Sequence, residues 1–205
     1  MSIPKILHFF APEDENDWQD KWKYCLNSWK KFFPDHEYQY IFWNDDEINN
    51  FVKEKFPHYY EVYSEFPYHI MQLDFARYCV LYFYGGIYSD LDVECKNNFY
   101  GNLKGNFFVY GNETMIYEKN CLMVSVKENH FLLSVMENTI NLYYEILYPL
   151  KRELVFRCGP LMLDNMMKNS GVVNKNIDIE FATHHKTGCW GKEDIKFLKN
   201  NRINT

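Results

Sequence analysis

Residues 71–94 read MQLDFARYCVLYFYGGIYSDLDVE, and this stretch decides the fold. Its first half repeats apolar side chains at helical spacing and closes with Gly85 and Gly86, as expected at a helix C-terminus, because glycine readily adopts a left-handed backbone. The second half predicts a short strand that ends in Asp90 and Asp92. Side chains two apart on a strand point to the same face, so the two carboxylates should be neighbours.

Two further charged residues, Asp74 and Arg77, lie on the helix of this stretch. They are three positions apart and therefore share one helix face. A helix that ends in two glycines before the strand can turn this face toward the two aspartates. The stretch therefore predicts four charged side chains at one spot.

The preceding segment alternates between strand and helix patterns. Residues 3–10 and 38–43 are β-rich runs, whereas residues 17–33 and 45–56 repeat apolar side chains at helical spacing. Asn44 suits the N-cap of the second helix. This order predicts an α/β domain with a mainly parallel central sheet flanked by helices, whose ligands bind at the carboxyl ends of the strands.

The following segment continues the alternation less regularly. Residues 107–110 and 121–126 predict strands, 128–148 a long helix, 152–158 another strand, and the residues from Pro160 a short helix. Residues 177–181 predict a late strand and 184–190 a polar loop. At 205 residues the chain is most simply one domain, spanning 1–205.

Composition excludes several classes of protein. Lys and Arg number 22 against 28 Asp and Glu, so the formal charge of -6 argues against a general nucleic-acid binder. No apolar run approaches the roughly 20 residues that span a bilayer. The six cysteines form no CxxC pair, and the N-terminus lacks a secretory signal pattern. These features predict a soluble, cytoplasmic protein.

The aspartate pair predicts either a bound cation or a proton shared between the two carboxylates. At about 5 Å and an effective dielectric near 20, two carboxylates repel by roughly 3 kcal/mol, more than a hydrogen bond typically contributes. Oxygen ligands of this kind suit Mg²⁺ or Mn²⁺. Alone, Asp90 and Asp92 could be a solvated strand end or an incidental Ca²⁺ site, and Asp74 with Arg77 could be a common exposed ion pair. Their combination favours a functional site.

The sequence resembles the DXD-containing glycosyltransferases, which include fungal α-mannosyltransferases and, more remotely, the catalytic domains of large clostridial glucosylating toxins. The resemblance rests on the central motif, the start of the chain, one early turn and weaker matches near the end. In order these are Asp74, Arg77, Tyr78, Leu81, Gly85-Gly86-Ile87-Tyr88 and Asp90-x-Asp92; Ile3-Pro4-Lys5-Ile6-x-His8; Trp43-Asn44-Asp45; and Gly159-Pro160, His185 and Trp190.

The resemblance implies a GT-A, Rossmann-like fold in which Mn²⁺, or Mg²⁺, bridges Asp92 and the diphosphate of a nucleotide sugar. Asp90 would contact the ribose or the sugar and reach the metal through water. Asp74 and Arg77 would hold the sugar hydroxyls, and Tyr88 would lie beside the diphosphate. The catalytic residues would be Asp74, Arg77, Asp90 and Asp92.

The resemblance also implies the remaining contacts of the donor. The first strand would line the nucleotide base with Leu7, His8, Phe9 and Phe10, although Ala11 stands where relatives often carry a Trp. Leu91, between the aspartates, would also belong to the donor site.

The loop 184–190 resembles a segment that closes over the diphosphate. His185 would be the third metal ligand, and Trp190 would donate to a phosphate oxygen. His184 is an equal candidate ligand by its chemistry.

The predicted function is transfer of a hexose to a glycan or another hydroxyl acceptor, as in polysaccharide biosynthesis. UDP-hexose is the first donor considered and GDP-mannose the second. The resemblance implies retention of the anomeric configuration by same-face attack. An inverting enzyme would need a carboxylate base, and Asp164 and Glu180 cannot be ranked for that role from the sequence.

Two other classes remain. Asp90-Leu91-Asp92-Val93 also fits the nucleophile motif of haloacid-dehalogenase-like phosphatases, with Asp90 as the phosphorylated residue, although that class carries the motif on its first strand. A non-catalytic, cation-dependent sugar-binding module would bind sugar regardless of nucleotide.

Overall fold

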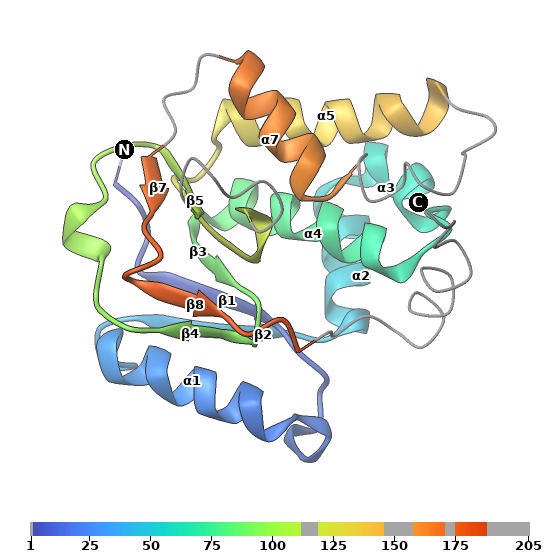
Figure 1. Ribbon diagram of the computed structural model, residues 1–205. Coiled ribbons are helices and arrows are strands. Elements are labelled where there is room, and N and C mark those ends of the chain that lie inside the picture. The colour runs from blue at the N-terminus through green and yellow to red at the C-terminus, as the bar shows by residue number, and fades with distance from the viewer. Residues whose placement is uncertain (1, 112–118, 146–157, 171–174, 188–205) are drawn as a thin grey trace, which may run out of the picture.

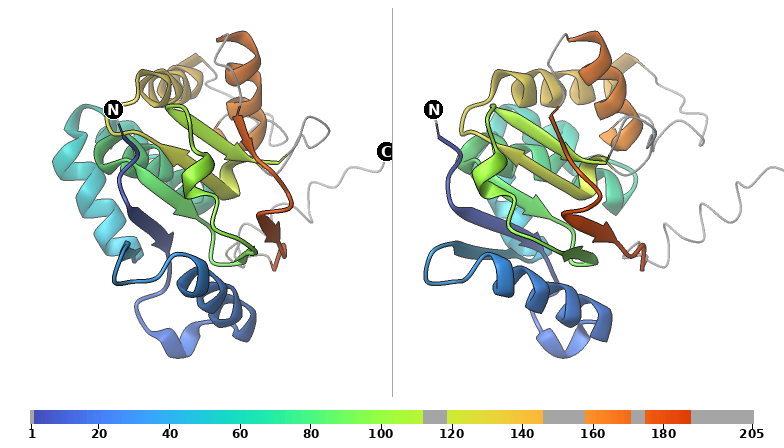
Figure 2. Two further views of the ribbon diagram at one scale, coloured as in Figure 1. Left: turned by 90° about the vertical axis from the view of Figure 1, so that its left-hand side faces the viewer. Right: turned by 60° about the vertical axis from the view of Figure 1, so that its left-hand side comes forward.

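The structure is a computed structural model that describes residues 2–111, 119–145, 158–170 and 175–187. A central sheet is covered by helices on both faces, as Figure 1 and the two rotated views of Figure 2 show. This arrangement confirms the predicted α/β fold class. The predicted strand at 152–158 lies almost wholly outside the described residues.

Within the described residues, the main sheet has six strands in the order β2-β1-β3-β6-β5-β7. They are β1 (Ile6–Phe10), β2 (Gln39–Trp43), β3 (Gly86–Ser89), β5 (Phe107–Tyr110), β6 (Leu122–Ser125) and β7 (Lys175–Ile177). Strand β1 runs parallel to β2 and β3, and β5 runs parallel to β7, whereas β6 runs antiparallel to both of its neighbours. The carboxyl ends of β1, β2 and β3 therefore meet at one edge, where ligands of open α/β sheets bind.

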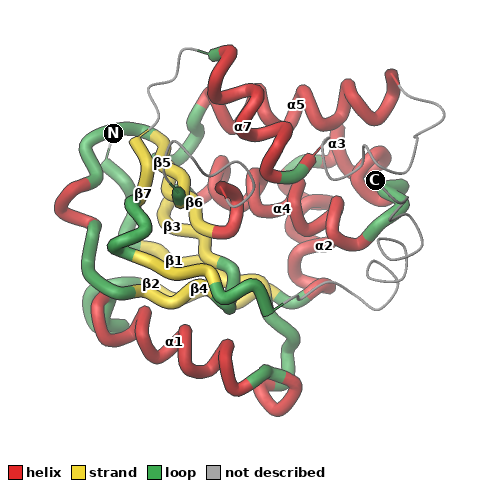
Figure 3. Tube along the Cα trace, in the orientation of Figure 1, coloured by secondary structure: helices red, strands yellow, loops and turns green. Residues whose placement is uncertain are grey.

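One face of this sheet packs against most of the helices. They are α2 (Asp45–Lys55), α3 (Pro57–Ser64), α4 (His69–Tyr84), α5 (His130–Glu145) and α7 (Pro160–Asn169). The other face packs against α1 (Asp20–Phe32) and a small sheet of β4 (Val93–Cys95) and β8 (Ala182–His184). Figure 3 shows α1 below the strands and the other helices on the opposite side. Short 3-10 turns occupy Glu15–Asp17, Tyr100–Asn102 and Lys119–Cys121.

Helix α4 is the central helix and is nearly enclosed. Nine of its sixteen residues are buried, including Asp74 and Arg77, because it lies between the sheet and three other helices. A helix that is apolar on most sides is expected at such a position. It ends at Tyr84 and is capped by Gly85, which has φ of 67°, and Gly86 follows with φ of 97°. The predicted helix and its glycine end are confirmed.

Two local predictions were wrong, and one helix was not predicted. Asp90 and Asp92 do not lie on a strand, because β3 ends at Ser89 and a turn follows in which the Val93 N–H donates to the Asp90 carbonyl. Residues 57–64 form helix α3, for which Pro57 suits the first position. Residues 178–181 form a turn between β7 and β8, closed by a hydrogen bond from the Phe181 N–H to the Asp178 carbonyl.

Within the described ranges, no helix combines the length and the apolar character needed to cross a bilayer. The expected cytoplasmic location stays a prediction.

Candidate active site

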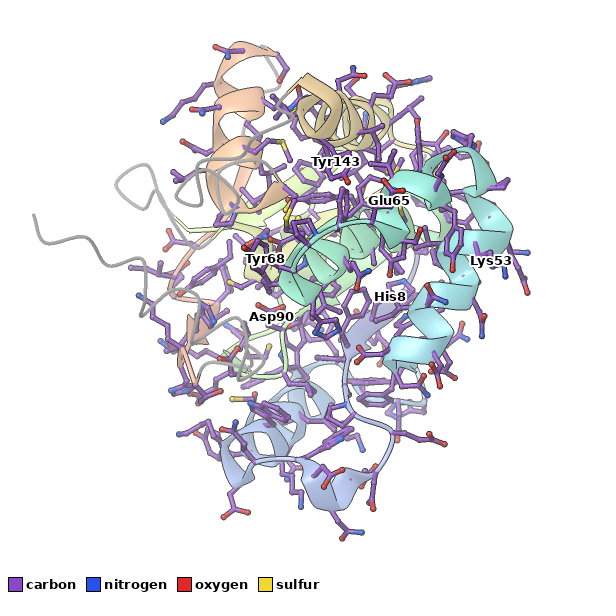
Figure 4. All side chains as sticks on the ribbon, turned by 90° about the vertical axis from the view of Figure 1, so that its right-hand side faces the viewer. His8, Lys53, Glu65, Tyr68, Asp90 and Tyr143 are labelled. Atoms are coloured by element: carbon purple, nitrogen blue, oxygen red, sulfur yellow. The ribbon has the colours of Figure 1, made fainter. Side chains whose placement is uncertain are left out.

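The turn after β3 presents two aspartates at the carboxyl edge of the sheet. It is fastened on one side by the Asp90 N–H, which donates to the Cys121 carbonyl at 2.8 Å. The Asp90 side chain is 23% exposed, whereas that of Asp92 is 3% exposed. Figure 4 labels Asp90 among the side chains of this region. Of the two carboxylates, Asp90 is therefore the more accessible to a ligand.

A histidine from the end of the described chain completes a possible metal site. Asp90, Asp92 and His184 each offer one ligand atom, and these atoms lie within 4.8 Å of one another. His184 Nε2 is 3.2 Å from Asp92 Oδ1. The pairing of β4 with β8, which sets His184 opposite Val93, brings these distant segments together.

His185 lies elsewhere. Its Nε2 is 2.8 Å from Glu94 Oε2, and Glu94 Oε1 accepts a hydrogen bond from the Tyr24 hydroxyl at 2.7 Å. Consecutive side chains of an extended segment point to opposite sides, so only one of the two histidines can face the aspartates. The structure brings the imidazole of His184, and not that of His185, to them.

The two oxygens of the Asp92 carboxylate differ in their hydrogen bonds. Oδ2 accepts hydrogen bonds from the Thr187 N–H at 2.8 Å and from the Thr187 hydroxyl at 3.1 Å. Oδ1 is buried and, although it faces His184, makes no hydrogen bond of regular geometry with any described residue. Burial raises the pKa of Asp92, but contacts with His184 and Thr187 together outweigh it and hold the pKa below its usual value.

This donor set fits a divalent cation. A buried, ionised carboxylate oxygen without a hydrogen bond is costly unless a cation or donor compensates it. A second carboxylate and an imidazole lie beside it. Two oxygen donors and one nitrogen are compatible with Mn²⁺ or Mg²⁺ whose other positions are filled by water or phosphate.

Arg77 links the helix to the aspartate turn. Its guanidinium lies 3.3 Å from Asp74 Oδ1 and 3.5 Å from Asp90 Oδ1, and it donates to the Asn120 carbonyl at 3.0 Å. Its side chain is 6% exposed, so this is no surface ion pair. The Tyr88 ring packs 5.0 Å from the guanidinium carbon, and the Tyr88 hydroxyl donates to Asp90 Oδ1 at 2.6 Å.

Burial raises the pKa values of the two acids in this network. It raises the pKa of Asp74 to about 6, against the opposing charge of Arg77, and it also raises the pKa of Asp90. For Arg77, burial acts to lower the pKa, but Tyr88 and the two carboxylates together raise it, so the guanidinium stays charged. The buried, charged guanidinium of Arg77 therefore holds the Asp74 and Asp90 side chains in place.

A pocket of about 360 Å³ adjoins this cluster at the ends of β1 and β2. Aromatic, aliphatic and acidic side chains line it, namely Phe10, Ala11, Pro12, Glu13, Trp22, Asn44, Asp45, Asp46, His69, Leu73 and Leu91. Leu91 lies between the two aspartates in the chain, so the pocket reaches the turn that carries them. A hydrogen bond to His69, at 3.1 Å, holds the pKa of Asp45 below its usual value.

Only one of the four first-strand residues predicted to line the base reaches this pocket. Phe10 lines it, whereas Leu7 and Phe9 are fully buried in the core beneath α1. His8 is also fully buried, where its Nδ1 accepts from the Trp43 indole and its Nε2 faces the Gly85 carbonyl at 3.0 Å. Leu7 and Phe9 point to the α1 face of the sheet, whereas His8 shares the opposite face with Phe10 but lies two residues farther from the end of β1. Of the four, Phe10 alone lies at the end of the strand, next to the pocket.

Sequence analysis missed several residues of the site. Asn120 donates to Asp74 Oδ1 at 2.9 Å, Thr187 binds Asp92, and Trp22 lines the pocket. Trp22 falls within the helical pattern of residues 17–33 and Thr187 within the polar loop 184–190, and neither pattern points to the site. Asn120 carries no sequence pattern that points to the site. Trp190 lies outside the described residues.

Comparison with known proteins identifies the fold. A solved structure described as PaToxG glycosyltransferase superposes with a TM-score of 0.57 at 17% identity, covering 82% of this chain and 70% of that one. This likeness agrees with the GT-A-like fold that the sequence predicts.

Two fungal relatives are more similar in sequence. An inositol phosphoceramide mannosyltransferase 1 of Schizosaccharomyces pombe is 32% identical over 78% of this chain and 50% of its own length. A mannosyl phosphorylinositol ceramide synthase of Saccharomyces cerevisiae is 28% identical over 96% of this chain and 54% of its own length. The chain thus spans about half the length of these relatives.

Residues 19–122, which contain the α4 pair, the two glycines and both aspartates, match the family described as glycosyltransferase sugar-binding region containing DXD motif. The match covers half of the chain and includes Asp74, Arg77, Asp90 and Asp92, the charged residues that the structure brings together. The chain therefore belongs to the family of DXD-containing glycosyltransferases.

Proposed function

We propose that the protein is a divalent-cation-dependent glycosyltransferase that transfers mannose from GDP-mannose to a hydroxyl group of a lipid or glycan acceptor. The observation that carries the proposal is the cluster of Asp90, Asp92 and His184 beside a pocket of about 360 Å³. The choice of mannose rests on the fungal relatives, which are named for mannosyl transfer to an inositol-containing ceramide. For this reason we rank GDP-mannose ahead of UDP-hexose, the donor first considered from the sequence.

Asp92 and His184 would hold Mn²⁺ or Mg²⁺, with Asp90 beside them. Bound there, the cation supplies positive charge against the diphosphate that leaves when the anomeric bond breaks. Phe10 and Trp22 offer aromatic surface to the base in the adjoining pocket.

Arg77 and Asp74 act mainly through Asp90. Both are almost fully buried, and the guanidinium contacts each carboxylate. Asp90 is the exposed member of this network and is the one suited to meet a sugar or ribose hydroxyl. Direct contact of Asp74 and Arg77 with the sugar stays a prediction.

Retention of the anomeric configuration is part of the proposal. An inverting reaction needs a free carboxylate as base. Asp164, one of the two bases considered, is 2% exposed, and its Oδ2 lies 2.6 Å from Lys168 Nζ. A buried, ion-paired carboxylate is a poor acceptor for a proton from an incoming hydroxyl, which argues against Asp164 as the base of an inverting reaction.

Donor hydrolysis by the purified chain tests the proposal. We expect Mn²⁺-dependent release of GDP from GDP-mannose, faster than release of UDP from UDP-glucose. Asp92→Asn should reduce the rate at least about 100-fold, a typical loss for one group that stabilises transition-state charge.

A thermal melt of Asp92→Asn that resembles the wild type would establish that its fold is intact. Turnover of this variant at the wild-type rate would refute the metal-dependent mechanism. Cation-dependent sugar binding that is indifferent to nucleotide and is not followed by turnover would favour a binding module.

A further inference from the structure

Three segments far apart in the chain meet in one line of hydrogen bonds at Asp92. The indole N–H of Trp22, on α1, donates to the Thr187 hydroxyl oxygen at 2.9 Å. The Thr187 hydroxyl in turn donates to Asp92 Oδ2 at 3.1 Å, and the Thr187 backbone N–H donates to the same oxygen at 2.8 Å. Trp22 is 7% exposed, so the start of this line is shielded from water.

The direction of each bond follows from chemistry. An indole N–H can only donate, so the Thr187 oxygen must be the acceptor. An ionised carboxylate can only accept, so the single hydroxyl hydrogen of Thr187 must point to Asp92. Trp22 thus determines which way the Thr187 hydroxyl faces.

The line also determines which oxygen of Asp92 remains for a ligand. Both hydrogen bonds from Thr187 fall on Oδ2, and Oδ1 is left facing His184. Without them the carboxylate could rotate about its terminal torsion, which has broad minima. Fixing that torsion presents Oδ1 in the direction of the possible cation site.

We propose that Trp22 and Thr187 are positioning residues, which orient the Asp92 carboxylate so that its Oδ1 binds the divalent cation. The inference rests on the proposed function, because it assigns these residues to the cation of that same site. Groups that hydrogen-bond to a metal ligand typically change metal affinity by 10 to 100-fold. Trp22 also lines the pocket, so one side chain contacts both the nucleoside space and the support of the metal ligand.

Mn²⁺ binding by the full chain without nucleotide, followed by the electron paramagnetic resonance signal of free Mn²⁺, tests the proposal. Thr187→Val removes the hydroxyl but keeps the backbone N–H and the side-chain shape, and should weaken binding about tenfold. Thr187→Ser keeps the hydroxyl, so its Mn²⁺ affinity should lie within about twofold of the wild-type affinity, a much smaller change than in Thr187→Val.

A double-mutant cycle tests whether Trp22 acts on Asp92 through the Thr187 hydroxyl. Trp22→Phe removes the indole N–H and should weaken Mn²⁺ binding about threefold. This loss is smaller than that of Thr187→Val, because Trp22 is hydrogen-bonded to Thr187 and not to Asp92 itself. Trp22→Phe combined with Thr187→Val should bind no more weakly than Thr187→Val alone, because Trp22 acts through the hydroxyl.

Trp18→Phe is the matched control. The Trp18 indole donates to the Pro12 carbonyl at 2.9 Å, away from Thr187, so this variant loses the same kind of bond without touching the line. Its Mn²⁺ affinity should equal that of the wild type.

Three results would overturn the proposal: Thr187→Val with wild-type affinity, Thr187→Ser as weak as Thr187→Val, or additive effects in the cycle. The comparison of Thr187→Val with Thr187→Ser decides the matter even if Trp22→Phe does not fold. Loss of binding in Asp92→Asn with none in Thr187→Val refutes only this inference, whereas a wild-type chain that binds neither Mn²⁺ nor Mg²⁺ refutes the proposed function as well.

Discussion

His184 and His185 are chemically identical neighbours with different surroundings. His184 lies with Asp90 and Asp92, whereas His185 contacts Glu94 on the other side of the same segment. The difference comes from the alternation of side chains along extended backbone. The sequence leaves open which of the two histidines binds the cation, and their different surroundings make this a question that substitutions can answer.

Alanine substitutions should separate the two histidines. His184→Ala removes a group within reach of the cation and should weaken Mn²⁺ binding at least tenfold, because even groups behind a metal ligand have effects of about that size. His185→Ala should leave Mn²⁺ affinity nearly unchanged and cost at most about 1 kcal/mol of stability, since its pair with Glu94 is partly exposed.

Calorimetric Mn²⁺ titration and urea unfolding of both variants provide the measurements. A larger loss of Mn²⁺ affinity in His185→Ala than in His184→Ala would contradict this assignment.

At the scale of the element, the junction of α4 and β3 depends on two glycines. Gly86 adopts φ of 97°, and a Cβ atom there would lie 2.5 Å from the Ile6 carbonyl oxygen on the neighbouring strand β1. Neither a backbone oxygen nor a parallel strand can move away cheaply. The glycine therefore lets β3 approach β1 closely and sets where the aspartate turn begins.

Gly86→Ala should lower the free energy of unfolding by about 3 kcal/mol, from left-handed backbone strain and the clash with β1. Gly101→Ala is the control, because a Cβ atom at Gly101 would meet nothing within 4 Å. That variant should change stability by less than about 0.5 kcal/mol. Chemical denaturation of both proteins gives the comparison, and equal stabilities would show that the close approach has no energetic consequence.

At the scale of the whole molecule, the buried His8 makes stability depend on pH. Burial lowers its pKa to about 4, while the Gly85 carbonyl acts in the opposite direction. Between the unfolded pKa of 6.5 and the folded value, the unfolded chain binds a proton that the folded protein does not. Its contribution is therefore fully present above pH 6.5 and is lost as pH falls toward 4, by up to about 3 kcal/mol.

Comparison of the wild type with His8→Gln isolates this contribution. The comparison is needed because Asp74, whose folded pKa is raised to about 6, contributes stability in the opposite direction as pH falls. The amide of Gln can replace both hydrogen bonds of the imidazole but does not titrate.

The stability advantage of the wild type over His8→Gln should shrink by about 2 to 3 kcal/mol from pH 7 to pH 4.5. Urea unfolding at several pH values measures it. An advantage that stays constant over this range would contradict the assignment of a depressed pKa to His8.

Most of the fold could be predicted because its elements carry strong local patterns. Helices α1, α2 and α4 repeat apolar residues at helical spacing, and β1 and β2 are compact runs. The elements that the sequence did not predict correctly carry weak patterns. The aromatic segment of α3 has no clear period, and β7 and β8 have three residues each. The single domain over 1–205 stays a prediction, since the relatives are about twice as long.

The sequence by itself determined the central motif, because a helix with Asp74 and Arg77, a glycine pair and two closely spaced aspartates are local features with fixed spacing. It also indicated the chemistry, since paired carboxylates call for a cation. Only the tertiary structure decided that His184 joins the aspartates, that Phe10 alone of the first-strand candidates reaches the pocket, and that Trp22 and Thr187 support Asp92. These contacts join segments up to 165 residues apart, and no local pattern of sequence encodes which side of each segment faces the other.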